Sequence, residues 1–156
     1  MIASQEKRAR IYLDVCCLNR PFDDQTQDRI RLEAEAVLLI LLHCETGEWQ
    51  WIGSEVVNFE IEQTPDQERR QRTRLLAIHA HQIARVGQAE VERAQQLTSL
   101  GLQPVDALHL ACAESEQADV FLTTDDRLLR MSSRLAGQLG VRVENPLIWL
   151  KEVMGQ

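Results

Sequence analysis

The chain has 156 residues, of which 44% are hydrophobic and 26% charged, and its formal net charge is −7. This length and composition are typical of a soluble globular protein, and they exclude a disordered chain. We expect a single domain over residues 1–156. The acidic balance excludes a protein that holds nucleic acid through general positive charge alone, because neutralising phosphates needs a basic surface. It is compatible with a protein that concentrates carboxylates in order to bind hard divalent cations.

The sequence indicates neither a membrane span nor a secretory signal. The longest apolar stretch, Ala34 to Cys44, is much shorter than the roughly 20 residues that cross a bilayer. The N-terminal segment MIASQEKRAR lacks the apolar core of a secretory signal, so we expect a cytoplasmic protein. The cysteines have neither disulfide nor metal-site spacing, and we expect them to be small buried hydrophobic residues. They are Cys16, Cys17, Cys44 and Cys112.

Short β-type runs alternate with longer helical patterns along the chain. The predicted strands are Arg10–Val15, Trp49–Gly53, Gln82–Val86, Asp119–Thr124 and Val141–Asn145. The predicted helices run over Thr26–Thr46, from Ser54 to about Pro65, from Pro65 to Ala80, over Gln88–Ser99 and Pro104–Ala118, from Asp125 to Leu139, and onward from Pro146. Thr26 and Ser54 are the expected N-caps of their helices. This alternation predicts a parallel sheet with helices on both faces, and such sheets bind ligands beyond the carboxyl ends of their strands.

Acidic side chains stand at the ends of the predicted strands. Asp14 ends the first strand, and Asp125 follows the fourth. Asp106 lies in the first turn of the helix that leads into the fourth strand, and Glu60 lies in the helix after the second. If the first and fourth strands are neighbours, these acids converge on one crevice. Two such charges 4 Å apart repel by about 4 kcal/mol at an effective dielectric of 20, and a divalent ion would relieve that repulsion.

Each acid also has a purely structural interpretation. Asp125 or Asp126 could cap the helix that starts there, and Asp106 could complement the dipole of its own helix. Glu60 could face solvent. Asp14 is the hardest to explain in this way, because its charge interrupts the buried strand pattern IYLDVCCL.

Basic residues and one histidine also have two interpretations. The stretch ERRQRTR contains Arg69, Arg70, Arg72 and Arg74. Arginine suits phosphate recognition, which makes the stretch a candidate RNA-backbone contact, but a solvated helix face is the favoured interpretation. His109 lies among apolar residues, and we expect a packed core histidine and not a ligand.

Several segments together resemble the PIN-domain family, in particular its VapC-like toxin ribonucleases. They are RIYLDVCCLNRPFDD, SEVVNFEIEQ, PVDALHLACA, VFLTTDDRLL and VENPLIWL, and DALHLACA followed closely by FLTTDD carries the most weight. The resemblance covers nearly the whole chain. It implies an α/β fold, a three-layer α/β/α sandwich around a five-stranded parallel sheet of order 3-2-1-4-5. It also implies cleavage of single-stranded RNA with Mg²⁺ or Mn²⁺, a homodimer and, for toxin members, a small antitoxin partner.

The resemblance also implies roles for particular residues. The implied catalytic acids are Asp14, Glu60, Asp106 and Asp125, and the metal ligands among them are Asp14, Asp106 and Asp125. The supporting residues are Thr123, Asn19, Arg20 and Asp126. Thr123 takes the family's hydroxyl position before the last acid, and Asp126 is the alternative to Asp125.

The chain departs from the family directly after the first acid. Family members often carry a hydroxyl residue or Asn there, whereas this chain has Val15, Cys16 and Cys17. We expect Asn19 and Arg20 to supply the missing polar contacts around Asp14.

Two alternatives to a metal-dependent endoribonuclease come from other classes. A phosphoacceptor receiver domain also collects acids at strand ends, but it needs a lysine at the end of its last strand. Here the only lysines, Lys7 and Lys151, lie near the termini. A catalytically quiet PIN-like scaffold that binds RNA or protein is the second alternative.

Overall fold

The computed structural model describes residues 7–155. Most of the N-terminal segment MIASQEKRAR, for which the sequence predicts no secretory signal, lies outside the described residues. One sheet holds the strands β1 (Arg10–Leu13), β2 (Gln50–Ser54), β3 (Gln82–Ala84), β4 (Val120–Leu122) and β5 (Arg142–Glu144). Its order is β3-β2-β1-β4-β5, and every neighbouring pair is parallel. This confirms the predicted fold class and strand order. Receiver domains of the flavodoxin-like type have the order 2-1-3-4-5, so the receiver hypothesis is wrong.

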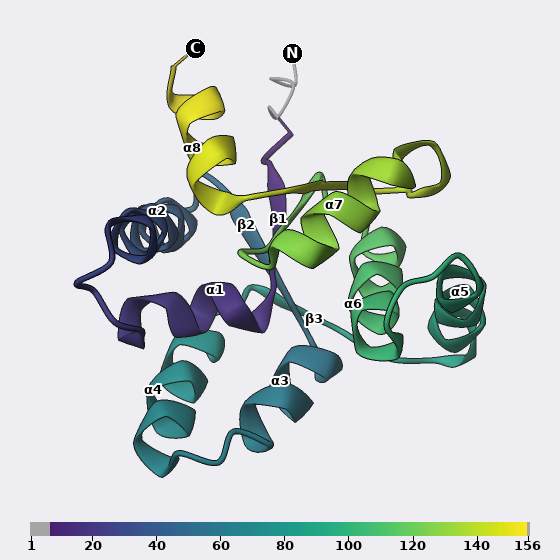
Figure 1. Ribbon diagram of the computed structural model, residues 1–156, viewed down its shortest axis with the longest axis horizontal. Coiled ribbons are helices and arrows are strands. Elements are labelled where there is room, and N and C mark those ends of the chain that lie inside the picture. Colours follow the sequence, from purple (N-terminus) through teal and green to yellow (C-terminus); the bar gives the residue numbers. More distant parts are fainter. Residues whose placement is uncertain (1–6, 156) are drawn as a thin grey trace, which may run out of the picture.

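Helices cover both faces of the sheet. They are α1 (Val15–Asn19), α2 (Asp28–Glu45), α3 (Glu55–Glu62), α4 (Gln67–Ala77), α5 (Gln88–Ser99), α6 (Pro104–Ser115), α7 (Asp126–Arg134) and α8 (Pro146–Met154), with 3₁₀ turns η1 (Arg20–Phe22) and η2 (Ala136–Gln138). Helices α2 and α8 lie on one side of the sheet, and α5 and α6 lie on the other (Figure 1). No helix within residues 7–155 is both long and apolar enough to span a membrane.

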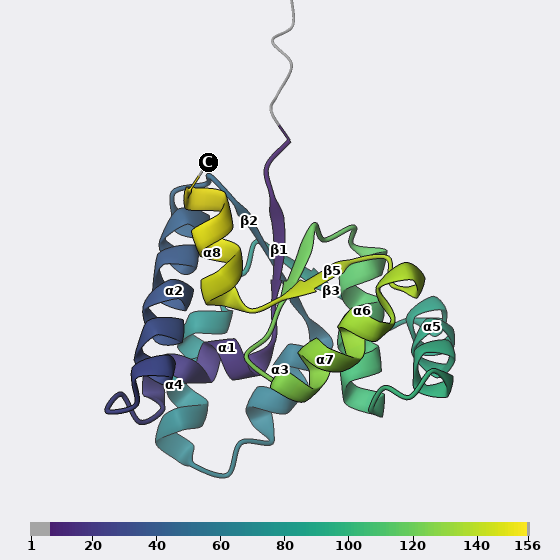
Figure 2. The ribbon, with the colours of Figure 1, turned by 45° about the horizontal axis from the view of Figure 1, so that its top comes forward.

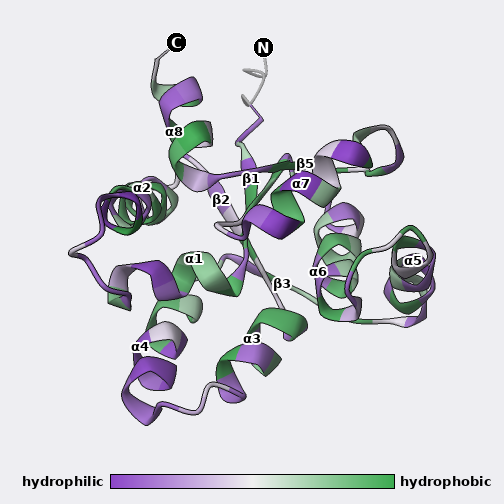
Figure 3. Cartoon of the chain, viewed as in Figure 1, coloured by the Kyte–Doolittle hydropathy of each residue, from purple (hydrophilic) through white to green (hydrophobic). Residues whose placement is uncertain are grey.

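The central strand β1 and its neighbours form the middle of the core. Ile11, Tyr12 and Leu13 are at most 1% exposed, and Ile52 and Phe121 on the flanking strands are fully buried. A parallel sheet covered on both faces needs such continuous apolar strands. Hydrophobic residues accordingly concentrate on the strands and the inward helix faces, while the outer faces are polar (Figure 3). The polar Asp14 therefore follows directly on three buried strand residues.

The first strand is shorter than predicted, and a helix that the sequence reading missed follows it. β1 ends at Leu13, and Asp14 has extended backbone angles and caps α1 by accepting a hydrogen bond from Val15 N–H. Val15, Cys17 and Leu18 are buried from a helix instead of a strand. The apolar run was compatible with either structure, and the cap at Asp14 decides between them.

The expected N-caps have different outcomes. Ser54 is confirmed as the N-cap of α3, because its Oγ accepts a hydrogen bond from Val57 N–H at 3.0 Å. Thr26 does not cap α2, which begins at Asp28 after Gln27. The Thr26 hydroxyl instead donates to Asp24 Oδ1 at 2.7 Å within the preceding turn.

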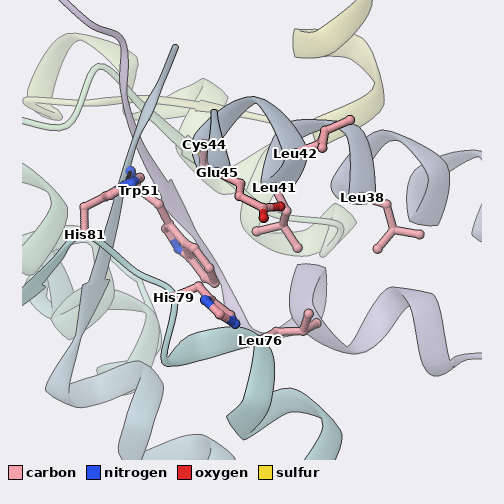
Figure 4. Close-up of a pocket in the computed structure, with 9 residues that line it drawn as sticks. All are labelled: Leu38, Leu41, Leu42, Cys44, Glu45, Trp51, Leu76, His79 and His81. Atoms are coloured by element: carbon pink, nitrogen blue, oxygen red, sulfur yellow. Dashed lines mark hydrogen bonds between the residues drawn. The ribbon is translucent and has the colours of Figure 1, made fainter. Parts of the chain in front are cut away.

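Helix α2 leaves an apolar surface uncovered on the monomer. Leu32, Leu38, Leu39 and Leu42 on this helix are between 41% and 51% exposed. Next to them, a pocket of about 500 Å³ lies between α2, β2 and the segment that follows α4. Figure 4 shows Leu38 and Leu42 at one side of this pocket and Trp51 and His79 at the other.

A buried carboxylate on α2 joins three parts of the fold. Glu33 is 1% exposed and accepts hydrogen bonds from Arg20 Nε at 2.9 Å and from Asn145 Nδ2 at 2.6 Å. Arg29, one turn earlier on the same helix, adds a contact at 3.3 Å. Removing one partner of a buried ion pair leaves the other charge uncompensated, which is costly.

We therefore expect Glu33→Ala to lower the free energy of unfolding by about 3 kcal/mol, because Arg20 and Asn145 lose their acceptor. Urea unfolding followed by circular dichroism measures this change. Glu35→Ala, an exposed position on the same helix, is the matched control and should change stability by less than about 0.5 kcal/mol. Equal losses in the two variants would show that the Glu33 pairs do not stabilise the fold.

Candidate functional site

The carboxylates lie at the carboxyl ends of the two central strands. Asp14 follows β1, and Asp125 follows β4, which pairs with β1. Glu60 lies on α3, which follows β2, and Asp106 lies in the first turn of α6. Helices α1, α3 and α7 begin at this same end of the sheet (Figure 2).

The Asp14 carboxylate is held by several donors. It is only 8% exposed, its Oδ1 accepts from Val15 N–H at 2.8 Å, and its Oδ2 accepts from the Thr123 hydroxyl at 2.9 Å. The Cys16 thiol lies 3.4 Å from the same Oδ2. These contacts satisfy part of a buried negative charge and fix its orientation.

Residue Thr123 joins the ends of the two central strands. Its hydroxyl donates to Asp14 and accepts from Asp125 N–H at 3.1 Å. Asp125 Oδ1 in turn accepts from Arg127 N–H and Leu128 N–H, so Asp125 caps α7. The structural interpretation of Asp125 is therefore correct, and its charge also contributes to the acid cluster described below.

A buried hydrogen-bond relay reaches Glu60. The His109 ring is fully buried, its Nε2 bonds to Glu60 Oε1, and its Nδ1 lies 2.6 Å from the Tyr12 hydroxyl. The Tyr12 hydroxyl in turn lies 2.6 Å from Ser54 Oγ, which caps the helix that carries Glu60. One chain of contacts therefore joins β1, α3 and α6.

Electrostatic strain concentrates on Asp106. Burial, followed by the charges of Asp14 and Asp125, raises the pKa of its carboxyl to about 6, and His109 offsets only part of this. The charge of Glu60 acts in the same direction. The four acids are thus close enough to repel one another.

The histidine carries the opposite effect. Burial lowers the pKa of His109, but the hydrogen bond to Glu60 and the charge of Asp14 outweigh burial and leave the pKa above its ordinary value. His109 is buried, as expected, but it faces acids and not apolar side chains alone. The i, i+3 spacing of Asp106 and His109 places both on one helix face, and this signal could have identified it.

The supporting residues are only partly where the sequence reading expected them. Asn19 donates to Val15 O at 3.2 Å, and Arg20 pairs with Glu33, so the expected contacts of these two residues to Asp14 are wrong. The half-buried Cys16 takes their place, with its thiol 3.3 Å from the Thr123 hydroxyl. A thiol, which is a weak hydrogen-bond donor, therefore stands where an oxygen or nitrogen donor was expected. Cys17, Cys44 and Cys112 are buried, as expected, and all four cysteines are free.

Asp126 points to a different partner. Its carboxylate accepts two hydrogen bonds from the Arg29 guanidinium, at 2.7 and 2.8 Å. This pairing lowers the pKa of Asp126. Because the charge of Asp125 acts on Asp106 whereas that of Asp126 is paired, Asp125 is the more suitable fourth acid of the cluster.

The arginine stretch lies on α4 and is largely engaged within the molecule. Arg69 pairs with Asp23 at 2.7 Å, and Arg74 pairs with Glu62 at 2.8 Å. Arg70 donates to Thr64 O, and Arg72 pairs with Glu68 while its guanidinium lies over the Phe22 ring. These partners favour the structural interpretation of the stretch, and RNA contact by it stays a prediction.

The donor set fits a divalent cation. Ligand atoms of Asp14, Glu60 and His109 lie within 4.8 Å of one another, and Asp106 and Asp125 add charge beside them. Carboxylate oxygens are the ligands that Mg²⁺ and Mn²⁺ prefer. A bound cation would also compensate the repulsion that raises the Asp106 pKa.

The raised pKa of Asp106 predicts that the metal-free protein is less stable at high pH than at low pH. The folded-state pKa of Asp106, about 6, lies above the ordinary 3.8, so stability is lost as the pH rises through 6. Asp106→Asn removes the charge, and we expect it to stabilise the protein in EDTA at pH 8 by about 1–3 kcal/mol, with little effect near pH 4. Urea unfolding at the two pH values measures both differences.

Asp126→Asn is the control for this measurement. Arg29 lowers the pKa of Asp126, so its loss should give no stabilisation at pH 8. Destabilisation of the Asp106→Asn variant at pH 8 in EDTA would contradict the repulsion that we infer.

Comparison with known proteins agrees with this geometry. Residues 11–133 match the family model of the PIN domain. No curated protein sequence matches the chain. The chain is similar in fold to two solved structures at low sequence identity. One is VapBC2 from Rickettsia felis bound to a DNA fragment from their promoter, with 16% identity, a TM-score of 0.52 and coverage of 87% of this chain and 98% of that chain. The other is VapBC-1 from nontypeable Haemophilus influenzae, with 13% identity, a TM-score of 0.56 and coverage of 88% and 98%.

Proposed function

The chain belongs to the PIN domain family, and on this basis we propose that it is a divalent-metal-dependent endoribonuclease that cleaves single-stranded RNA. The observation that carries the proposal is the cluster of Asp14, Glu60, Asp106 and Asp125 at one end of the sheet, where burial and, after it, the charges of the neighbouring acids raise the pKa of Asp106 to about 6. Repulsion within the cluster is a cost to the fold that points to a function, and the acids that cause it are the groups that would bind the ion in metal-assisted phosphodiester hydrolysis.

Each acid has a distinct part in the proposed site. Asp14, Asp106 and Asp125 would hold Mg²⁺ or Mn²⁺, and Glu60, whose side chain is 35% exposed, would face the substrate beside them. When bound, the ion lowers the pKa of a coordinated water and neutralises charge on the scissile phosphate. Thr123 keeps Asp14 and Asp125 in register through its two hydrogen bonds.

The orientation of Asp14 is set before any ion binds. Val15 N–H occupies one lone pair of Oδ1 and leaves the other available for a cation, whereas Oδ2 accepts from both the Thr123 hydroxyl and the Cys16 thiol. A preorganised carboxylate of this kind loses no rotamer freedom on binding, and this favours a tight site.

The central test is a cleavage assay on single-stranded RNA with Mn²⁺. We expect Asp14→Asn and Asp106→Asn each to lower the cleavage rate by roughly 100-fold or more, because each removes charge from the site of the developing negative charge. Asp126→Asn, at the exposed acid paired with Arg29, is the matched control and should retain activity.

Full activity in EDTA would overturn the metal-dependent nuclease. Absence of cleavage by the wild-type chain, with Mn²⁺ bound and the fold intact, would instead support the alternative of a catalytically quiet scaffold. Circular dichroism of every variant separates a lost site from a lost fold.

The toxin role and the protein partners belong to the same proposal. The two similar structures are named as VapBC assemblies, and the resemblance of this chain to VapC-like toxins implies a small antitoxin. The exposed leucines of α2 and the pocket beside them form the apolar surface that such a partner would cover, because monomeric proteins seldom leave such patches bare. A homodimer and a cytoplasmic location are also part of this proposal.

Expression in a bacterial host tests this partner surface. We expect the wild-type chain to arrest growth and an antitoxin encoded beside it to relieve the arrest. Leu38→Glu with Leu42→Glu should keep the toxicity but lose the relief, because two charges would be buried in an apolar interface. Val91→Glu, at a 42% exposed position on α5, is the control and should leave the relief unchanged. Relief of the double variant would show that α2 is not the interface.

A further inference from the structure

We propose that His109 supplies a nitrogen ligand to the divalent ion through Nε2, so that this site favours later first-row transition ions such as Co²⁺ over Mg²⁺. The inference rests on the proposed metal site and concerns which ion that site takes. It adds to the carboxylates a donor of another chemical kind, from a residue that the sequence reading assigned to the core.

The position of Nε2 carries the first step. It bonds to Glu60 Oε1 and lies 3.8 Å from Asp14 Oδ1, and the three ligand atoms all lie within 4.8 Å of one another. An ion at about 2.1 Å from each donor separates adjacent ligands by roughly 3 Å and opposite ligands by roughly 4 Å. Only the Glu60–His109 pair has to open slightly to admit the ion.

The other ring nitrogen carries the second step. Metal-ligating histidines almost always donate their second ring N–H to a fixed acceptor, which sets the tautomer. Here Nδ1 lies 2.6 Å from the buried Tyr12 hydroxyl, which can accept from Nδ1–H and donate its own hydrogen bond to Ser54 Oγ, also at 2.6 Å. Without an ion, Nε2–H donates to the Glu60 carboxylate. Binding of the ion would release this proton to solvent, and with Nδ1–H donating to the Tyr12 hydroxyl the lone pair of Nε2 would face the ion between Asp14 and Glu60.

Aromatic packing fixes the plane of the ring. The His109 ring meets Tyr12 edge-on at 5.7 Å and 76°, and meets Phe121 at 6.3 Å and 68°. The ring is fully buried, so it cannot turn away to solvent. A histidine with a purely packing role has no need to direct a nitrogen at two acids, whereas a ligand does.

The nature of the donor decides the preference between ions. Mg²⁺ favours oxygen ligands and retains its waters, whereas imidazole strengthens the binding of later first-row ions. A nitrogen ligand therefore raises the affinity for Co²⁺ and adds little for Mg²⁺. If His109 only positioned Glu60, its loss would weaken all three ions alike.

The experiment measures Co²⁺, Mn²⁺ and Mg²⁺ binding to the full chain by calorimetry, without reference to cleavage. We expect His109→Gln to lower the Co²⁺ affinity by about 10- to 100-fold and the Mg²⁺ affinity by less than about threefold, because an amide oxygen replaces the nitrogen. Tyr12→Phe removes the Nδ1 partner and should weaken Co²⁺ binding to a smaller extent. His79→Gln, at an exposed histidine beside the α2 pocket, is the matched control and should change nothing.

A measurement on wild-type protein keeps the test independent of whether His109→Gln folds. Pulsed electron paramagnetic resonance of the Mn²⁺ complex should show coupling to a directly bound nitrogen. Absence of that coupling, or an equal loss of Co²⁺ and Mg²⁺ affinity in His109→Gln, overturns the inference. Nitrogen coupling without any RNA cleavage would support the ligand and reject the nuclease. Cleavage without nitrogen coupling would do the reverse.

Discussion

The placement of one buried negative charge, on Asp14, determines how the rest of the site is built. The carboxylate comes directly after the buried residues of the central strand β1, where an unpaired charge would cost several kcal/mol. It is satisfied by the first N–H of α1 and by the Thr123 hydroxyl from the neighbouring strand end. Both donors exist only because β1 turns into a helix at this point and because β4 lies beside it. Strand order, helix cap and site geometry are therefore one constraint.

The remaining acids add repulsion that the fold only partly offsets. One oxygen of Asp125 accepts the hydrogen bonds that cap α7, and Asp126 is paired with Arg29. Burial and, after it, the charges of the neighbouring acids raise the pKa of Asp106. His109 lies among these acids; burial lowers its pKa, but the hydrogen bond to Glu60 and the charges of Asp14 and Asp106 raise it. The arrangement is destabilising for an isolated domain and favourable for one that binds a cation, a common trade between stability and function.

Much of this organisation was accessible from the amino-acid sequence. The alternation of strands and helices, with the resemblance to the PIN family, predicted the sheet order, and acids at strand ends indicated one edge of that sheet. Helix α1 was missed because Val15, Cys17 and Leu18 suit a strand as well as a helix, and only the cap at Asp14 distinguishes them.

Other features depend on tertiary contacts that spacing along the chain does not report. The Cys16 thiol stands where the family often has a hydroxyl residue or Asn, while Asn19 bonds to Val15 O and Arg20 pairs with Glu33. The bond between His109 and Glu60 needs α3 and α6 to meet, although the two residues are 49 positions apart. Local patterns therefore place the acids, and long-range packing determines which neutral and basic groups accompany them.

The relay through Tyr12 also has an evolutionary consequence. Ser54, Tyr12 and His109 belong to β2, β1 and α6, and each hydroxyl or ring nitrogen has the next as its buried partner. Replacing Tyr12 by Phe leaves one nitrogen of the buried imidazole without a partner, at a cost of about 1–3 kcal/mol, whereas replacing Tyr12 and His109 together removes that nitrogen as well. Descendants of this sequence should therefore either keep both Tyr12 and His109 or replace both.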